Sequence, residues 1–244
     1  MRSMIPFVLA FFAALAMALP THSLAQDYSA IVAAPDRGDA DRQTDQRRDP
    51  VKLMAFTGVR AGMTVLDMGA GGGYSTELMA RAVGPSGKVY GQDFETGARA
   101  KERFDARMKT DAMKKVVALA RPFDDPLPAD VGNVDLITFF FFYHDTTYMT
   151  VDRAAMNKKL FGALKPGGFL VIADHSAKPG AGTSVGKTLH RIEESALRGE
   201  VEAAGFKLVG RGDWLRHPED PRDERIFQPK VPVDEFVLKF EKPQ

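Results

Sequence analysis

The chain has 244 residues, with 33 basic and 32 acidic side chains and no cysteine. A balanced charge without a block of one sign gives no electrostatic footprint for nucleic acid, so no nucleic-acid partner is expected. The lack of cysteine excludes disulfides, thiolate chemistry and the common zinc sites built on sulfur. The length suits one α/β domain, which buries about 70% of the surface of its unfolded chain.

Residues 1–25 have the pattern of a secretory signal peptide. Arg2 precedes the apolar stretch Phe7–Leu19, Pro20 ends that stretch, and small residues occupy Ser23–Ala25. The apolar stretch is shorter than the roughly 20 residues of a membrane span. We therefore expect cleavage after Ala25 and a periplasmic or secreted protein with no stable membrane anchor.

The next segment, residues 26–49, is rich in Asp, Arg and Ala and has few large apolar residues. This composition predicts a solvated N-terminal arm. Asp49 followed by Pro50 is a helix-start signal, with an N-cap acid and a proline at the first helical position. A helix is predicted from there through Phe56.

The segment 65–73 reads Val-Leu-Asp-Met-Gly-Ala-Gly-Gly-Gly, an apolar strand end followed by an acid and glycines. Glycines between a strand and a helix allow positive φ and let a ligand approach the backbone, so this turn predicts a nucleotide or cofactor site. A dinucleotide fingerprint needs a small residue where this chain has Tyr74. The pattern therefore disfavours NAD.

A helix is predicted over Tyr74–Val83, and Gly84 and Pro85 end it. The short β-prone run Lys88–Gln92 then places Asp93 at the carboxyl end of a strand. An ionised carboxylate can accept hydrogen bonds from both hydroxyls of a ribose. Asp93 therefore indicates a nucleoside, whether of NAD or of another cofactor.

Further apolar runs continue the alternation of strands and helices. The run that starts at Val134 is almost continuously apolar, as a strand covered on both faces requires. A double glycine at Gly167 and Gly168 predicts a turn before the next strand. The remaining expected elements are the strand Val116–Leu119, the helix Leu189–Ala204, and the strands Lys207–Val209 and Glu235–Phe240.

The Asp-x-Gly-x-Gly-x-Gly motif at 67–73, the acid at 93 and the later landmarks stand in the order of a known family. Residues 50–244 resemble the class I, Rossmann-like S-adenosylmethionine-dependent methyltransferases, here in an exported bacterial form. The resemblance implies an α/β three-layer sandwich with a seven-stranded, mostly parallel sheet and an antiparallel last strand. It also implies S-adenosyl-L-methionine as the cofactor. The cofactor-binding residues that it implies are Asp67, Gly69, Ala70, Gly71, Gly73, Asp93, Phe94, Phe123, Asp124 and Phe142.

Two details of this resemblance stay open. The acid expected to meet the adenine amino group is Asp124 or Asp125, and the landmark Leu127-Pro128 shifts the expected position toward Phe123. Segments before the first strand often fold over the donor in this family. The arm is then a lid, with Tyr28 or Arg47 and Arg48 facing the site.

Ligands in an open parallel sheet lie outside the carboxyl ends of the strands. Tyr143, His144 and Asp145 follow the predicted fourth strand and are the candidate catalytic residues, while Asp174 and His175 follow the fifth. His144 is the preferred general base, because histidine titrates near neutral pH and a carboxylate adjoins it. The alternative is a histidine that only caps a helix or bonds a loop carbonyl.

His190 and Arg191 are expected either to line the acceptor pocket or to form a solvated helix start. No metal is expected, since no ligand cluster is evident, although the carboxylates at 145 and 174 leave a metal open.

These features predict a methyltransferase that acts on an unidentified small-molecule acceptor. One alternative is an exported, non-catalytic module that binds a nucleoside or S-adenosylmethionine, and another is an NAD-type oxidoreductase. Export favours the first alternative to some degree, because S-adenosylmethionine is made in the cytosol. The sequence gives no indication of the oligomeric state.

Overall fold

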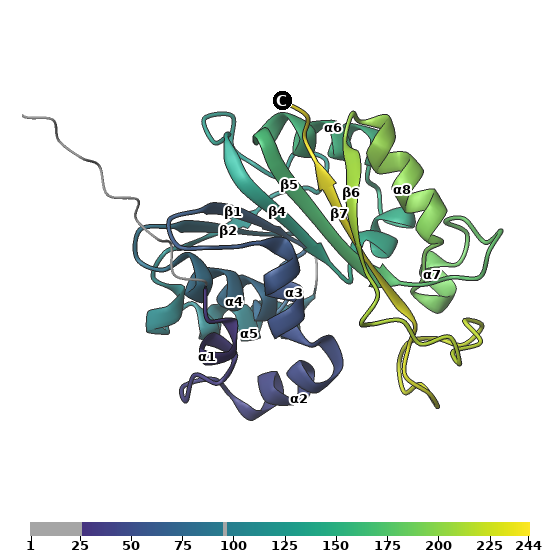
Figure 1. Cartoon of the computed structure of the whole chain (residues 1–244), viewed down its shortest axis with the longest axis horizontal. Coiled ribbons are helices and arrows are strands. Elements are labelled where there is room, and N and C mark those ends of the chain that lie inside the picture. The colour runs from purple at the N-terminus through teal and green to yellow at the C-terminus, as the bar shows by residue number, and fades with distance from the viewer. Residues whose placement is uncertain (1–25, 95–96) are drawn as a thin grey trace, which may run out of the picture.

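The computed structural model describes residues 26–94 and 97–244 (Figure 1), so the predicted signal peptide lies outside the described residues. Its centre is a seven-stranded sheet in the order β3-β2-β1-β4-β5-β7-β6. The strands are β1 (Thr64–Met68), β2 (Lys88–Asp93), β3 (Val116–Ala120), β4 (Val134–Phe140), β5 (Leu164–His175), β6 (Lys207–Gly212) and β7 (Glu235–Glu241).

Helices cover both faces of this sheet, as Figure 1 shows, and each face has its own apolar core. One core includes side chains of α3, α4 and α5, and the other includes side chains of α6 and α8. The helices are α1 (Tyr28–Val32), α2 (Asp39–Arg48), α3 (Pro50–Thr57), α4 (Tyr74–Val83), α5 (Ala98–Arg107), α6 (Arg153–Ala163), α7 (Gly186–Leu189) and α8 (Glu194–Ala203), with short 3₁₀ helices η1 (Asp111–Met113) and η2 (Tyr143–Thr147).

The sheet confirms the predicted architecture. The pairs β1–β2, β1–β4, β2–β3 and β4–β5 are parallel, whereas β7 runs antiparallel to β5 and β6. Because β7 is reversed, its first residue Glu235 pairs with His175, the last residue of β5. The start of β7 therefore lies at the edge where the parallel strands end.

Two local predictions are wrong. The expected turn at Gly167 and Gly168 is part of β5, where the pairing with β4 shifts register between Val134 and Leu136. Of the expected helix Leu189–Ala204, the part Glu194–Ala203 is helical as α8, because His190 has a left-handed φ of 54° that ends α7 at Leu189. Neither His190 nor Arg191 is a helix start, since α8 begins at Glu194.

The N-terminal arm is not a solvated segment. Its apolar residues Tyr28, Ile31 and Val32 pack against the core that α3 and α4 share. The Tyr28 hydroxyl donates a hydrogen bond of 2.6 Å to the carbonyl oxygen of Val59. The composition wrongly suggested a solvated arm, because a few apolar residues are enough to pack a segment on the core when its charged residues form ion pairs.

Ion pairs hold α2 to the rest of the domain. Arg107 of α5 donates two hydrogen bonds to Asp41, at 2.7 and 2.8 Å, and also pairs with Glu77 of α4. Asp45 accepts hydrogen bonds from Arg37, at 2.7 and 2.8 Å, and from the Tyr74 hydroxyl, at 2.6 Å. These pairs fix the end of α2 beside the first residue after the glycine turn.

None of the helices in residues 26–94 and 97–244 combines the length and apolar character that crossing a membrane requires.

Candidate functional site

Asp67, in β1, is hydrogen-bonded to the residues that follow the glycine turn. Its carboxylate is fully buried and accepts hydrogen bonds from three hydroxyls, those of Ser75 at 2.9 Å, Thr76 at 2.7 Å and Thr138 at 2.7 Å. Burial raises the pKa of Asp67, and the three hydroxyls oppose that rise. Asp67 thus ties β1 to the start of α4 and to β4, and a direct contact with cofactor stays a prediction.

The glycine turn needs its glycines for conformation and for space. Gly69, Gly71 and Gly73 have φ values of 64°, 53° and 81°, which residues with a Cβ atom rarely adopt. A Cβ on Gly69 would lie 2.9 Å from Cγ of Phe142, so the Phe142 ring packs directly on the turn. Gly73 caps α4, and a Cβ there would lie 3.0 Å from Phe104.

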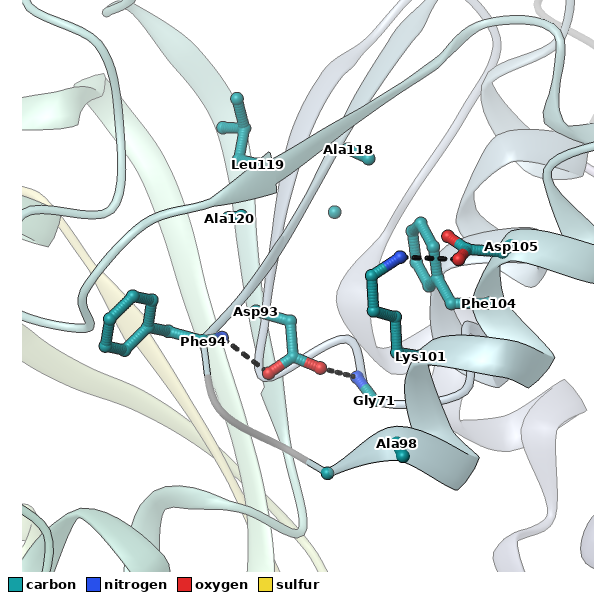
Figure 2. Close-up of a pocket in the computed structure, with 12 residues that line it drawn as sticks. Gly71, Asp93, Phe94, Ala98, Lys101, Phe104, Asp105, Ala118, Leu119 and Ala120 are labelled. Atoms are coloured by element: carbon teal, nitrogen blue, oxygen red, sulfur yellow. Dashed lines mark hydrogen bonds and ion pairs between the residues drawn. The ribbon is translucent and has the colours of Figure 1, made fainter.

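Asp93 extends from the end of β2 into a cavity beside this turn (Figure 2). One carboxylate oxygen accepts a hydrogen bond of 2.9 Å from the Gly71 backbone N–H, and the other accepts one of 2.6 Å from the N–H of Phe94. The cavity has a volume of about 380 Å³, and its lining includes Gly71, Asp93, Phe94, Lys101, Leu119 and Ala120.

This cavity fits the nucleoside part of a cofactor. Its walls are mainly apolar, as a purine base requires, and Gly71 presents backbone without a side chain. The Asp93 carboxylate, which accepts from the N–H groups of Gly71 and Phe94, is the group that the prediction assigns to the ribose hydroxyls, since a carboxylate has about four lone-pair sites. The half-exposed Phe94 ring stands at the rim, where it can cover a base.

Of the predicted cofactor set, Gly71, Asp93 and Phe94 line this cavity, whereas Asp67, Gly69, Ala70, Gly73, Phe123, Asp124 and Phe142 do not. Ala70 is buried, and its N–H donates to the carbonyl oxygen of Gln92. Phe123 is only 1% exposed and stacks on Phe142, with ring centroids 5.1 Å apart. Asp124 accepts a hydrogen bond from the N–H of Asp152.

Asp125, the alternative acid for the adenine amino group, does not line this cavity either. It pairs with Arg121 and Lys159. Both acids of this loop therefore bind other parts of the chain, Asp124 the N–H of Asp152 and Asp125 the side chains of Arg121 and Lys159.

Tyr143, predicted as a candidate catalytic residue, lies in the core, where a substrate does not reach its hydroxyl. Its side chain is fully buried, the hydroxyl donates to Glu200 at 2.8 Å, and Asn157 donates to the hydroxyl at 2.8 Å. Burial and the nearby Glu200 raise the pKa of Tyr143. The residue belongs to the core beside Phe139, at 5.5 Å between ring centroids.

His144 lies at the predicted edge but between two carboxylates. Its Nδ1 lies 2.7 Å from Oδ1 of Asp174 and its Nε2 lies 3.2 Å from Oδ1 of Asp145. Burial lowers the pKa of His144, but the two acids outweigh burial and raise the pKa to about 10. As this cluster stands, His144 already holds a proton at neutral pH, which argues against its role as the base.

Glu235 is a candidate base that the sequence analysis missed. Its carboxyl is buried, and its Oε1 lies 2.9 Å from Nδ1 of His175, without the angle of a hydrogen bond. Burial raises the pKa of Glu235 to about 8, with Arg48 and Arg47 opposing the rise. Burial likewise lowers the pKa of His175 to about 3, so that ring is neutral. The signal in the sequence was an acid at the start of an antiparallel last strand.

Glu235 also lines a second cavity, of about 420 Å³, between α2 and the loop before β7. Arg48 connects this region to the glycine turn, because its guanidinium lies 5.4 Å from the Tyr74 ring and 4.4 Å from the Phe141 ring. Phe141 has a left-handed φ of 58°, a strained conformation that is concentrated at functional sites. The other residues of this cavity are Gln43, Gln46, Arg47, His217, Pro232 and Val233.

Comparison with known proteins agrees with this geometry. The features concerned are the glycine turn, the Asp93 carboxylate beside it and the strand order β3-β2-β1-β4-β5-β7-β6. A family model described as a methyltransferase domain matches residues 60–207. The chain belongs to this methyltransferase family. This membership confirms the prediction of S-adenosylmethionine as the cofactor, whereas its place in the cavity beside Asp93 stays a prediction.

Individual curated relatives match only about half of the chain. A demethylmenaquinone methyltransferase of Lactococcus lactis is 34% identical over 126 residues, which are 51% of this chain and 47% of that protein. The chain thus spans about half the length of the curated relatives it matches.

Solved structures share the fold. A S-adenosylmethionine-dependent methyltransferase from Aquifex aeolicus superposes with a TM-score of 0.60 at 21% identity, covering 88% of this chain and 97% of that one. A [4+2]-cyclase superposes with a TM-score of 0.59 at 16% identity, covering 84% and 82%. The fold alone therefore does not determine the reaction.

The position of Asp93 predicts a defined loss of cofactor affinity. Asp93→Asn removes the charge from the acceptor of the ribose hydroxyls, and a hydrogen bond to a charged group contributes about 1.5–3 kcal/mol. Binding of S-adenosylhomocysteine, measured by calorimetry, should weaken about tenfold or more. Asp105→Asn is the matched control, because Asp105 lines the same cavity but pairs with Lys101. Equal losses in both variants would remove the assigned role of Asp93.

Glu235 predicts a pH dependence of stability. Its folded pKa of about 8 lies above the ordinary value of 4.5, so the folded state keeps a proton that the unfolded state releases. The free energy of unfolding should therefore fall as pH rises from 4.5 to about 8, with Arg48, Arg47, Asp174 and His217 as the facing charged groups. Glu235→Gln abolishes this dependence and should gain roughly 1–3 kcal/mol over the wild type between pH 5 and 8.

Urea unfolding at both pH values measures this gain. Glu202→Gln, at a half-exposed acid that pairs with Arg198, is the control and should show no such trend. A constant difference between wild type and Glu235→Gln at both pH values would contradict the raised pKa.

Proposed function

We propose that the protein is an S-adenosylmethionine-dependent methyltransferase that acts on a small-molecule acceptor. The observation that carries the proposal is the cavity of about 380 Å³ in which Asp93 and Gly71 lie together at the carboxyl edge of the sheet. Family membership supports the cofactor, and the second cavity supports a separate place for an acceptor.

The second cavity favours a compact acceptor with polar groups. Its volume of about 420 Å³ is in the range of small-molecule sites. Arg47 and the amides of Gln43 and Gln46 supply hydrogen-bond donors from α2, and Glu235 supplies an acceptor. The arm that carries α2 is thus proposed as a fixed cover of the acceptor side, consistent with the lid alternative.

The chain's own residues have two tasks in this reaction. When bound, S-adenosylmethionine supplies a methyl group on a positively charged sulfur. The turn from Gly69 to Gly73 and the Asp93 carboxylate hold the nucleoside, so that the acceptor is aligned with that methyl group. Glu235 takes the acceptor's proton on a carboxylate oxygen in its ionised form, which becomes populated as the pH rises toward the Glu235 pKa of about 8.

The proton transfer leaves the acceptor as a nucleophile. Held by the glycine turn and Asp93, S-adenosylmethionine would supply the methyl carbon for the new bond, and the electron pair of the broken carbon–sulfur bond would stay on sulfur. The products are S-adenosylhomocysteine and the methylated acceptor. Phe142, packed on Gly69, and Phe141 provide apolar surface beside the turn, which limits competing water.

Calorimetric titration of the purified mature protein tests the proposal. S-adenosylmethionine and S-adenosylhomocysteine should each bind at one site per chain, and NAD should give no heat beyond dilution, because Tyr74 occupies the third glycine position of the dinucleotide fingerprint. Binding of NAD in place of the adenosyl compounds would favour the oxidoreductase alternative. Silence toward all three ligands would contradict the proposal.

Transfer itself is tested with radiolabelled methyl donor and mixtures of small metabolites fractionated by polarity. Label should enter an organic product in the wild type and fall strongly in Glu235→Gln, whereas donor affinity should change little. Tight donor binding without incorporation would favour the non-catalytic binding module.

We further propose export, with residues 1–25 removed and the domain working in the periplasm or outside the cell. The proposal rests on the charge and apolar pattern of that segment. Protein recovered from the extracytoplasmic fraction should begin at Gln26, and a cytosolic protein that keeps Met1 would contradict export.

A further inference from the structure

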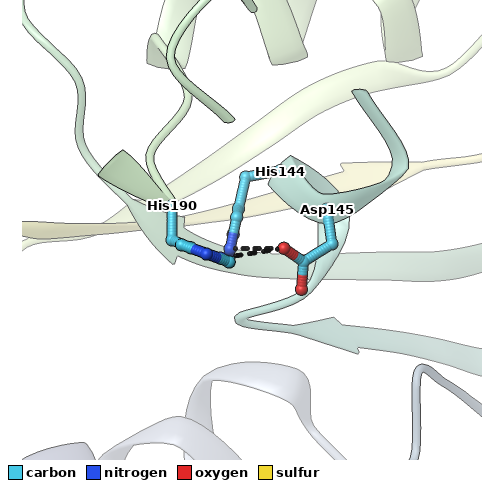
Figure 3. Close-up of side chains that lie close together, drawn as sticks. All are labelled: His144, Asp145 and His190. Carbon is cyan, nitrogen blue, oxygen red and sulfur yellow. Dashed lines mark hydrogen bonds and ion pairs between the residues drawn. The ribbon is translucent and has the colours of Figure 1, made fainter. Parts of the chain in front are cut away.

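Three side chains from two separate segments converge near the carboxyl end of β4 (Figure 3). His144 and Asp145 come from η2 after β4, and His190 follows α7. Each residue offers one ligand atom, and these atoms lie within 4.8 Å of one another. The cluster combines two imidazoles and one carboxylate.

The distances are those of atoms that share one ion. Oδ1 of Asp145 lies 3.2 Å from Nε2 of His144 and 3.1 Å from Nδ1 of His190. Ligand atoms of a tetrahedral zinc site, with bonds of about 2.0–2.2 Å, are separated by roughly 3.3 Å. Small side-chain movements therefore bring all three atoms to bonding distance.

The surroundings orient the ligands as metal-binding proteins do. Nδ1 of His144 faces the fully buried Asp174 at 2.7 Å, which turns Nε2 toward the cluster. Asp174 is itself held by the backbone N–H groups of His144 and His175, each at 2.8 Å. A carboxylate behind a ligating histidine fixes its tautomer and orientation.

The backbone brings the two segments together tightly. A Cβ on Gly186, at the start of α7, would lie 2.1 Å from Oγ1 of Thr147 in η2. His190 then has a left-handed φ of 54°, which directs its ring to Asp145. Because the side chains of Asp145 and His190 are each 17% exposed, an ion has a path from solvent.

We propose that His144, Asp145 and His190 form a binding site for a divalent first-row transition ion such as Zn²⁺. Two nitrogen ligands favour such an ion over Mg²⁺ and Ca²⁺, which prefer oxygen. This proposal departs from the sequence-based expectation of no metal, which did not bring His190 together with His144 and Asp145.

Three protein ligands leave at least one coordination position open, as in catalytic rather than structural zinc sites. An ion there can bind an acceptor oxygen and lower the pKa of its hydroxyl. This role rests on the proposed function, whereas ion binding itself does not and is measured without donor or acceptor.

Metal titration of the full mature protein, free of any affinity tag, tests the site. After treatment with a chelator, Zn²⁺ should bind at one site per chain in competition with a chromophoric chelator, and Mg²⁺ should not compete. Co²⁺ should bind at the same site with visible absorption bands that Zn²⁺ abolishes. The absence of saturable Zn²⁺ binding would overturn the proposal.

Variants locate the ion. His190→Gln and Asp145→Asn should each lower the Zn²⁺ affinity tenfold or more, with far-UV circular dichroism confirming the fold. His217→Gln is the matched control, because His217 also lies beside an acid, 3.2 Å from Glu219, but outside the cluster. An unchanged affinity in folded His190→Gln, or an equal loss in His217→Gln, would overturn the assignment.

Discussion

The buried carboxylate of Asp67 is the constraint on which the cofactor site depends. An ionisable group without exposure is stable only when its hydrogen-bonding capacity is used, and here three hydroxyls use it. Ser75 and Thr76 belong to α4, and Thr138 belongs to β4. The same group therefore fixes the direction of the helix after the glycine turn and the position of the neighbouring strand.

The carboxyl edge of the sheet divides into two chemical regions. On the side of β2 and β3 the cavity is apolar, with Asp93 as the group that reaches toward the glycine turn. On the side of β4, β5 and β7 the edge carries buried acids and histidines, among them Asp174, His144 and Glu235. The pKa values of His144 and Glu235 are raised, whereas the pKa of His175 is lowered. Acids and histidines with such shifted pKa values are typical of sites for proton transfer or metal binding.

The sequence predicted the parts of the fold that local physics determines. The helix Tyr74–Val83 was predicted with its observed ends, because glycine marks both of them. The strand that ends at Asp93 was predicted from its short β-prone run. Contacts between distant segments were not predictable in this way. The pairing of Arg107 with Asp41 makes the arm part of the domain, and the pairing of Arg191 with Asp220 replaces the expected helix start by a buried ion pair.

The candidate catalytic residues show the same limit more sharply. Its position after a strand places His144 at the carboxyl edge of the sheet, as predicted, but its contacts depend on Asp174, which comes from the next strand. Glu235 escaped notice because its role depends on the reversed direction of β7, which places a strand start among strand ends. A solved [4+2]-cyclase has the same fold, so the scaffold alone leaves the reaction undetermined. We therefore expect the reaction of this chain to depend on the second region, where Asp145 and His190, which are 45 positions apart in the chain, lie 3.1 Å apart.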